Sequence, residues 1–182
     1  LKNTKTKYAL VLNPDTILAV NAIENFLNRV KKNEHFWLLG PANDQMINLS
    51  FKNNDLLEVN SIKGFAIFFN LSKFNNDFFD ENYFLYFEEI DLCKKVKNNN
   101  GLIYLDPKII IKHRGAESVG KISNFELEKN RNWHWMWSTF YFHKKHKGLL
   151  LAFLIILPKL TSALIKVIFS ERIWIGERVR DL

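Results

Sequence analysis

The chain has 182 residues, of which 47% are hydrophobic, 14% aromatic and 25% charged. This much apolar surface favours burial over chain entropy, so the composition excludes a disordered or fibrous chain and suits one compact domain with an appendage. The net charge of +7 is uneven: residues 131–182 hold nine Lys or Arg and three acidic residues. The first 130 residues are therefore nearly neutral, unlike a uniformly basic nucleic-acid-binding protein.

Cysteine content and the start of the chain bear on its compartment. Cys93 is the only cysteine, so no intrachain disulfide can form and an oxidising compartment receives no support. No signal peptide is visible at the N-terminus. We therefore expect a cytoplasmic protein. Because the chain begins at Leu1 and enters a strand almost at once, we also expect upstream sequence to be missing.

The first elements alternate strand and helix. Tyr8 to Leu12 is an apolar run that stops at Asn13-Pro14-Asp15, which predicts a buried strand followed by a polar turn. Residues 17–32 are predicted to form a helix with Thr16 as its N-cap. Its apolar positions recur at helical spacing at Ile17, Val20, Ile23, Leu27 and Val30.

Short elements follow through the middle of the chain. Strands are predicted over residues 36–39, 57–62, 65–71, 102–105 and 108–112, and a helix over about Glu88 to Lys97. Gly101 follows three asparagines and indicates a left-handed helix end. The last two strands flank Asp106-Pro107, and the second of them leads into His113.

The last third of the chain is predicted to be helical. Ser123 and Glu126 fit a capping box for a helix that runs to about His146 and is crowded with aromatic residues. Residues 149–169 are largely apolar, but Pro158, Lys159 and Lys166 interrupt them and make a poor membrane span.

Polar residues at strand ends form the first candidate site. Asn13, Asp15 and His113 all fall where predicted strands end, and open α/β folds bind ligands at the carboxyl ends of their strands. An Asp and a His on two rigid strands can bind a divalent cation, which neutralises a diphosphate leaving group. The alternative is structural, with Asp15 capping a helix and His113 an ordinary edge residue.

Carboxylates packed among aromatic residues form the second candidate site, over residues 79–92. Bulky apolar neighbours desolvate a carboxylate and raise its pKa, which suits a general base that takes a proton from a hydroxyl. The alternative is a solvated acidic first turn of a helix, stabilised by the helix dipole.

Taken together, these segments resemble family-2 glycosyltransferases, and most closely their rhamnosyltransferase-like branch. The resemblance covers residues 8 to about 147 and rests on 12–16 (Leu-Asn-Pro-Asp-Thr), Lys63-Gly64, residues 79–92, and His113 with Ser118. It implies an α/β fold of GT-A type, with a mixed sheet flanked by helices. It also implies an inverting enzyme that moves a sugar, rhamnose being one candidate, from a nucleotide-diphosphate donor to a glycan or lipid-linked acceptor in cell wall polysaccharide biosynthesis.

The resemblance implies roles for residues of the donor site. Asp15 would bind the Mg²⁺ or Mn²⁺ that bridges the nucleotide diphosphate, His113 would be a further metal ligand, and Asn13 would contact the nucleotide sugar. Lys63 and Gly64 would lie beside the donor phosphates and the acceptor. The family binds the nucleobase upstream of the segment that Tyr8 opens, so inactivity of this chain on its own is one expectation.

The catalytic base implied by the resemblance is Glu89. The family's acidic motif carries Asp at this position, and Glu reaches about one methylene further, so the motif departs from the pattern here. Asp91 is the alternative carboxylate, although two residues along a helix direct it about 200° away from Glu89. Glu88 would contribute to substrate binding.

We expect three parts in the chain: the C-terminal half of a GT-A catalytic domain over residues 1–120, an aromatic and basic helix over 121–148, and an apolar and basic, membrane-associated helical tail over 149–182. The acceptor pocket is expected to vary in loops such as 43–58. Residues 131–182 are basic and rich in Trp, and we predict that they lie on the cytoplasmic face of an anionic membrane as amphipathic helices that do not cross the bilayer.

Three alternatives to this assignment differ in class. The C-terminal helices could instead pack on the catalytic domain as a helical subdomain. The whole chain could be a non-catalytic peripheral membrane protein with a degenerate GT-A domain. Binding of nucleic acid would use the tryptophans as a stacking platform, but it leaves the almost purely apolar residues 149–157 unexplained, so we expect no nucleic acid partner.

Overall fold

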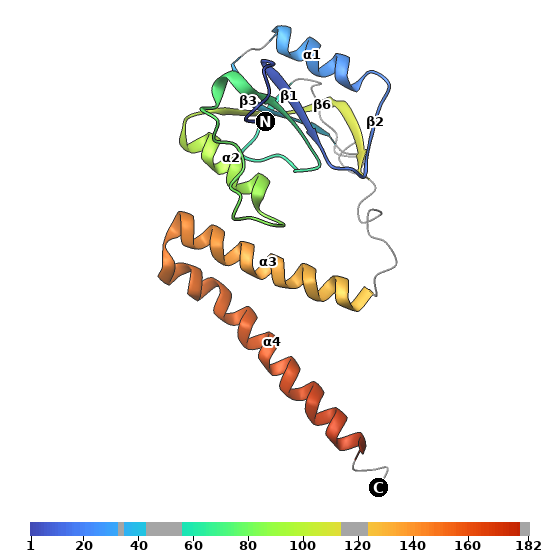
Figure 1. The fold of residues 1–182 in the computed structure, drawn as a ribbon, viewed down its shortest axis with the longest axis vertical. Coiled ribbons are helices and arrows are strands. Elements are labelled where there is room, and N and C mark those ends of the chain that lie inside the picture. The colour runs from blue at the N-terminus through green and yellow to red at the C-terminus, as the bar shows by residue number, and fades with distance from the viewer. Residues whose placement is uncertain (33–34, 43–55, 114–123, 179–182) are drawn as a thin grey trace. The chain divides into compact units, whose positions relative to one another are not determined.

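The computed structural model describes residues 1–32, 35–42, 56–113 and 124–178, and side chains of the last range are described for residues 129–165. The chain divides into two compact units, Leu1–Leu127 and Glu128–Leu182. The first is a mixed α/β domain and the second is helical (Figure 1). The boundary expected after residue 120 falls outside the described residues.

Unit 1 is built on a mixed sheet that has six strands in the described residues. They are β1 (Tyr8–Leu12), β2 (Thr16–Leu18), β3 (Phe36–Ala42), β4 (Leu57–Glu58), β5 (Ala66–Asn70) and β6 (Leu102–His113). The order is β1-β5-β3-β6-β2, with β4 beside β6. β5 is antiparallel to β1 and β3, while β3 is parallel to β6. Consequently β1, β3 and β6 run the same way, and their carboxyl ends meet at one edge.

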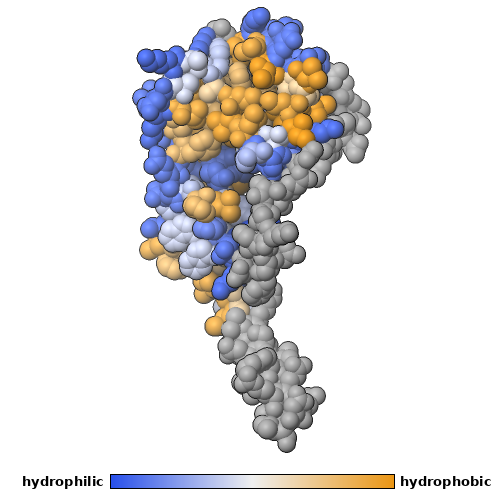
Figure 2. Space-filling view, turned by 45° about the vertical axis from the view of Figure 1, so that its right-hand side comes forward, coloured by the Kyte–Doolittle hydropathy of each residue, from blue (hydrophilic) through white to orange (hydrophobic). Residues whose placement is uncertain are grey.

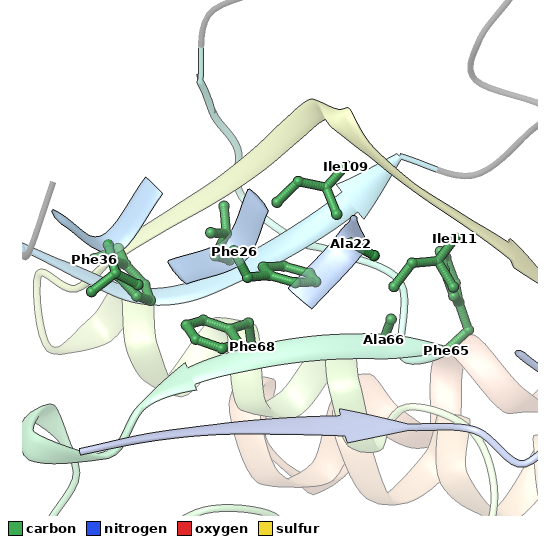
Figure 3. Close-up of a cluster of buried hydrophobic side chains, with 10 residues drawn as sticks. Ala22, Phe26, Phe36, Phe65, Ala66, Phe68, Ile109 and Ile111 are labelled. Atoms are coloured by element: carbon green, nitrogen blue, oxygen red, sulfur yellow. The ribbon is translucent and has the colours of Figure 1, made fainter. Parts of the chain in front are cut away.

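Two helices cover opposite faces of this sheet, namely α1 (Ala22–Lys32) and α2 (Glu88–Asn98). Successive side chains of a strand point to opposite faces. Phe68 of β5 accordingly packs in the cluster that contains α1, and Phe69 packs in the cluster that contains α2. Figure 3 shows the α1 cluster, in which the rings of Phe26 and Phe68 stack with their centroids 4.9 Å apart. A short 3-10 helix, η2 (Leu71–Lys73), follows β5.

The predicted helix over residues 17–32 is wrong at its amino end. Thr16–Leu18 forms β2, which pairs antiparallel with the end of β6, and α1 begins only at Ala22. Pairing with β6 provides hydrogen-bond partners for backbone groups that the first turn of a helix would leave unpaired. The buried face also differs from the prediction, because Phe26 is buried while Ile23 and Leu27 are 54% and 46% exposed.

Other predicted elements are confirmed in place, including β1, β3, β5 and α2. The strands predicted on either side of Asp106-Pro107 are one continuous β6, and its pairing with β3 shifts register between Pro41 and Ala42. The bulge accommodates Pro107, which has no backbone N–H to donate a hydrogen bond to the neighbouring strand. The strand predicted over 57–62 is reduced to Leu57–Glu58.

The end of α2 corrects the expected role of Gly101. The residue with positive φ is Asn100, at 55°. Gly101 is needed for space instead, because a Cβ there would lie 2.5 Å from Cγ1 of Val96 and 2.9 Å from the Trp37 ring. Asparagine tolerates the left-handed region better than most residues, so Asn100 can take the positive φ. Gly101 follows it, where the backbone packs closely against Val96 and Trp37.

One buried ion pair connects α1 to β6. Asp106 is 0% exposed, and its carboxylate accepts hydrogen bonds from Nε and Nη2 of Arg29, the latter at 3.2 Å. The backbone N–H of Lys108 donates a further bond to it at 2.9 Å. The buried Asp106 carboxylate is thus hydrogen-bonded immediately before Pro107, and the positive charge of Arg29 compensates its negative charge.

We predict that Arg29→Met lowers the free energy of unfolding by about 3 kcal/mol, because the buried charge of Asp106 then lacks its partner. Urea denaturation followed by circular dichroism measures this. Lys31→Met, on the exposed side of the same helix, serves as the control and should change stability by less than about 0.5 kcal/mol. Equal effects of the two substitutions would contradict a structural role for the pair.

Unit 2 is a hairpin of α3 (Asn124–Lys147) and α4 (Leu149–Arg178), which turns at Gly148 with φ of 89°. The helices are joined by Phe140 against Phe153, at 5.2 Å between centroids, and by Nζ of Lys159, 3.5 Å from the centre of the Trp135 ring. α4 continues through Pro158. The capping box proposed at Ser123 and Glu126 lies outside the described side chains. Among the described residues, no helix combines the length and apolar character needed to cross a membrane.

Candidate functional site

A tight turn after β1 positions Asp15. The backbone N–H of Asn13 donates to the carbonyl of Phe65 at 2.9 Å, at the start of β5. The Asn13 carbonyl in turn accepts from the N–H and Oγ1 of Thr16, at 3.2 and 2.7 Å. These bonds turn the chain directly from β1 into β2, and Asp15 lies within the turn with its side chain 10% exposed.

His113 ends β6 beside this turn. It pairs with Thr16 of β2, so β2 holds the end of β6 against the residue that follows Asp15. Nε2 of His113 lies 3.3 Å from Oδ1 of Asp15. The imidazole also stacks on the Phe65 ring, with 5.2 Å between centroids and 17° between planes. The predicted proximity of Asp15 and His113 is confirmed.

The spacing of these two atoms is compatible with a shared divalent cation. Two ligands about 2.1 Å from one ion, at adjacent coordination positions, stand roughly 3 Å apart. A carboxylate oxygen with an imidazole nitrogen suits Mn²⁺ better than Mg²⁺, which prefers oxygen ligands alone. The described residues contain no group of three or more His, Cys, Asp or Glu side chains that could hold a metal.

Glu89 lies in the first turn of α2, against the loop that precedes β5. A Cβ placed on Gly64 would be 3.4 Å from Cβ and Cγ of Glu89 and 3.5 Å from its Cδ. Any side chain longer than alanine at position 64 would therefore displace the glutamate. Lys63 is close enough to act electrostatically on the Glu89 carboxylate. Three residues predicted for the site are thus neighbours.

The environment of Glu89 raises the pKa of its carboxyl group, and desolvation by burial is the largest cause. The negative charge of Glu88 raises this pKa further. The backbone N–H groups of Glu89 and Ile90 and the positive charge of Lys63 oppose the shift without cancelling it. Glu89 is half-buried, so its carboxylate is desolvated while part of the side chain remains exposed.

Gly64 and Phe65 connect the two halves of the site. Gly64 borders Glu89, and the next residue, Phe65, contacts both Asn13 through its carbonyl and His113 through its ring. Consecutive Cα atoms are 3.8 Å apart, so Glu89 and the Asp15–His113 pair border two adjacent residues of the chain. The structure brings together Asn13, Asp15, Lys63, Gly64, Glu89 and His113.

Asp91 has a different environment from Glu89. It is 1% exposed and accepts a hydrogen bond from the Tyr83 hydroxyl at 3.3 Å. A substrate hydroxyl cannot reach this buried carboxylate, so its position indicates a structural role. Glu88 is half-buried, and its Oε2 is enclosed without a hydrogen-bond donor among the described residues.

Backbone strain lies immediately before these carboxylates. Tyr86 and Phe87 have φ of 68° and 70°, in the left-handed region that large side chains rarely adopt. Such conformations persist only where surrounding packing enforces them, and they concentrate at functional sites. Here they direct the chain abruptly into α2, which places Glu88 and Glu89 at its first two positions.

Phe65 and Thr16 are site residues that the sequence reasoning missed. Phe65 opens an apolar strand and has no feature that distinguishes it from its core neighbours; its position next to Lys63-Gly64 was the available signal. Thr16 was assigned to a helix cap. Ser118 and most of the expected acceptor loop, residues 43–55, lie outside the described residues.

Compared with known proteins, the chain matches no protein-family model and no curated protein.

We predict that Glu89→Gln raises the melting temperature at pH 7 to 8 and has little effect near pH 4. Because burial raises the pKa of Glu89, the folded protein holds this proton to higher pH than the unfolded chain. The associated stability is complete below the unfolded pKa of about 4.3 and is lost as pH rises through the folded pKa. Glutamine carries no charge and avoids that loss.

Scanning calorimetry across this pH range tests the expectation, with Glu81→Gln as the control because the Glu81 side chain is 86% exposed. A lower melting temperature for Glu89→Gln at pH 7 would mean that the helix N–H groups outweigh desolvation.

Proposed function

We propose that this chain carries the catalytic part of an inverting glycosyltransferase that uses a nucleotide-diphosphate sugar. The observation that supports this most is the Asp15–His113 pair, 3.3 Å apart and in contact with Phe65, together with a desolvated glutamate that borders the preceding Gly64. Sugar transfer from such a donor requires stabilisation of a diphosphate leaving group and removal of a proton from the acceptor hydroxyl. The two halves of the site suit these two tasks.

Asp15 and His113 would hold Mg²⁺ or Mn²⁺. When bound, the ion supplies positive charge that neutralises the leaving diphosphate. The protein's own contribution is to hold the carboxylate and imidazole rigidly, through the Thr16–His113 pairing and the Phe65 stack. Lys63, beside Glu89, offers a second positive charge to the phosphates.

Glu89 would act as the general base. A carboxylate with a raised pKa is a stronger base at neutral pH than an exposed one, which suits deprotonation of a sugar hydroxyl. Attack by that hydroxyl opposite the leaving group breaks the bond between the anomeric carbon and the phosphate oxygen in one step, which inverts the configuration. The enclosed Oε2 of Glu88 can accept a hydrogen bond from a sugar hydroxyl.

Finer features of the proposal come from the sequence resemblance. They are the GT-A form of the fold, the rhamnosyltransferase-like character, and a glycan or lipid-linked acceptor in cell wall polysaccharide biosynthesis. The mixed sheet with helices on both faces is compatible with the first of these.

In a form of the enzyme that includes a complete donor site, we predict that Glu89→Gln lowers turnover by about 10² to 10⁴ while donor binding is retained, because only the proton-accepting group is lost. Release of nucleoside diphosphate from a panel of donor sugars measures turnover, and proton NMR of the product reports its anomeric configuration. Glu81→Gln is the matched control, because it removes an exposed carboxylate of the same 79–92 segment. Near-normal turnover of Glu89→Gln, or retention of configuration, would contradict the assigned base.

We predict that the chain binds Mn²⁺ and that Asp15→Asn and His113→Ala each weaken this binding at least about 10-fold, because each removes a direct ligand. Isothermal titration calorimetry with Mn²⁺ measures it, and His35→Ala, an exposed histidine outside the site, is the control. The competing function is a non-catalytic protein in which Asp15 and His113 only pair with each other. That alternative predicts no Mn²⁺ binding and a loss of stability in both variants.

A further inference from the structure

Helix α4 presents an apolar face that no described residue covers. On one side Ala152 and Ile156 are buried, and Lys159 contacts Trp135 of α3. Spacings of three, four and seven residues place the opposite side on one stripe of a helix. That stripe consists of Leu150, Leu154, Leu157 and Leu164, which are 77%, 57%, 55% and 61% exposed.

This outer face conflicts with an aqueous environment. A helix that is apolar on every side is covered either by protein or by lipid, since water-exposed apolar patches of this kind are rare in soluble proteins. The prediction of amphipathic helices is therefore corrected for the described part of α4, whose packed and exposed sides are both apolar. Aromatic side chains of α3 add to the exposed surface, with Trp133 at 70% and Trp137 at 48%.

The charge of the hairpin indicates what covers it. Residues 129–165 contain no Asp or Glu, and their cations are Lys129, Arg131, Lys144, Lys145, Lys147 and Lys159. Lys144, Lys145 and Lys147 cluster in the last turn of α3, next to the turn at Gly148. A second copy of the hairpin carries the same positive charge, which does not favour association. An anionic lipid surface combines an apolar layer with negative charge and matches both features.

We propose that the α3–α4 hairpin is a membrane-surface anchor for anionic lipids. The outer leucines of α4 enter the boundary between headgroups and acyl chains, and the three lysines at the end of α3 contact the headgroups. We place the hairpin on the surface because its clustered lysines suit lipid headgroups and Lys159 interrupts the apolar run of α4. Lys159, held against Trp135, keeps the packed side of α4 turned toward α3. This proposal does not depend on transfer chemistry.

The apolar contact is tested with the whole chain and vesicles of phosphatidylcholine, with or without phosphatidylglycerol, in a flotation assay at low and high salt. The wild-type chain is expected to float with anionic vesicles, and salt should weaken the binding. Leu154→Gln/Leu157→Gln should abolish it. The matched control is Ile23→Gln/Leu27→Gln, a pair of exposed apolar residues on α1, which should bind as the wild type does.

The electrostatic contact is tested by replacing Lys144, Lys145 and Lys147 with Gln. Loss of three headgroup contacts is expected to weaken binding to anionic vesicles about 100-fold at low salt. Replacement of the exposed Lys5, Lys31 and Lys32 with Gln removes the same charge from unit 1 and should have little effect. Circular dichroism verifies that each variant folds.

Four outcomes would overturn the anchor. The first is a wild-type chain that stays with the soluble fraction at low salt. The second is equal loss of binding in the variant and its control. The third is sedimentation that shows a stable oligomer dissociated by Leu154→Gln/Leu157→Gln, which would assign the leucine face to a second copy. The fourth is protease access to the hairpin from both sides of a sealed vesicle, which would show that it crosses.

Discussion

β5 runs antiparallel between β1 and β3, and the geometry of the candidate site depends on this pairing. With β5 in that position, β1, β3 and β6 all point toward one edge, while the amino end of β5 lies at that same edge. Residues after β1 and β6 therefore meet residues just before β5. This is why Asp15, His113 and Gly64, far apart in the sequence, belong to one site.

Stability and reactivity oppose each other at the start of α2. Buried side chains of this helix, Leu92, Cys93 and Val96, attach it firmly to the sheet. The same packing desolvates Glu89, and the chain enters the helix through two residues with positive φ. Both features cost free energy in a fold that has little to spare. Their coincidence beside Gly64 is the strongest structural argument that this end of α2 serves a function.

Unit 2 differs from unit 1 in how far its apolar side chains are buried. In unit 1 apolar side chains converge into two clusters between sheet and helices, whereas α4 leaves much of its apolar surface exposed. Figure 2 also shows hydrophobic area on the displayed face of unit 1. Exposed apolar residues of unit 1 include Ile17 of β2 and Ile23 and Leu27 of α1. Only unit 2 combines such surface with an excess of positive charge. An enzyme with a lipid-linked acceptor would benefit from such an anchor, because acceptor and catalytic domain would then share one membrane surface.

The sequence alone determined those helices and strands that the residue pattern of their own segment is sufficient to predict, without knowledge of which distant strands they pair with. The apolar run at Tyr8–Leu12 and the helix at Glu88–Asn98 are of this kind, and strand ends at Asp15 and His113 sufficed to predict their meeting. Only the tertiary structure decided the other elements and site residues. Thr16–Leu18 carries a helical apolar spacing, yet its pairing with β6 makes it a strand, and the same pairing sets the spacing of Asp15 from His113. Phe65 became a site residue only because β5 begins where β1 and β6 end, and no local pattern encodes which strands are neighbours.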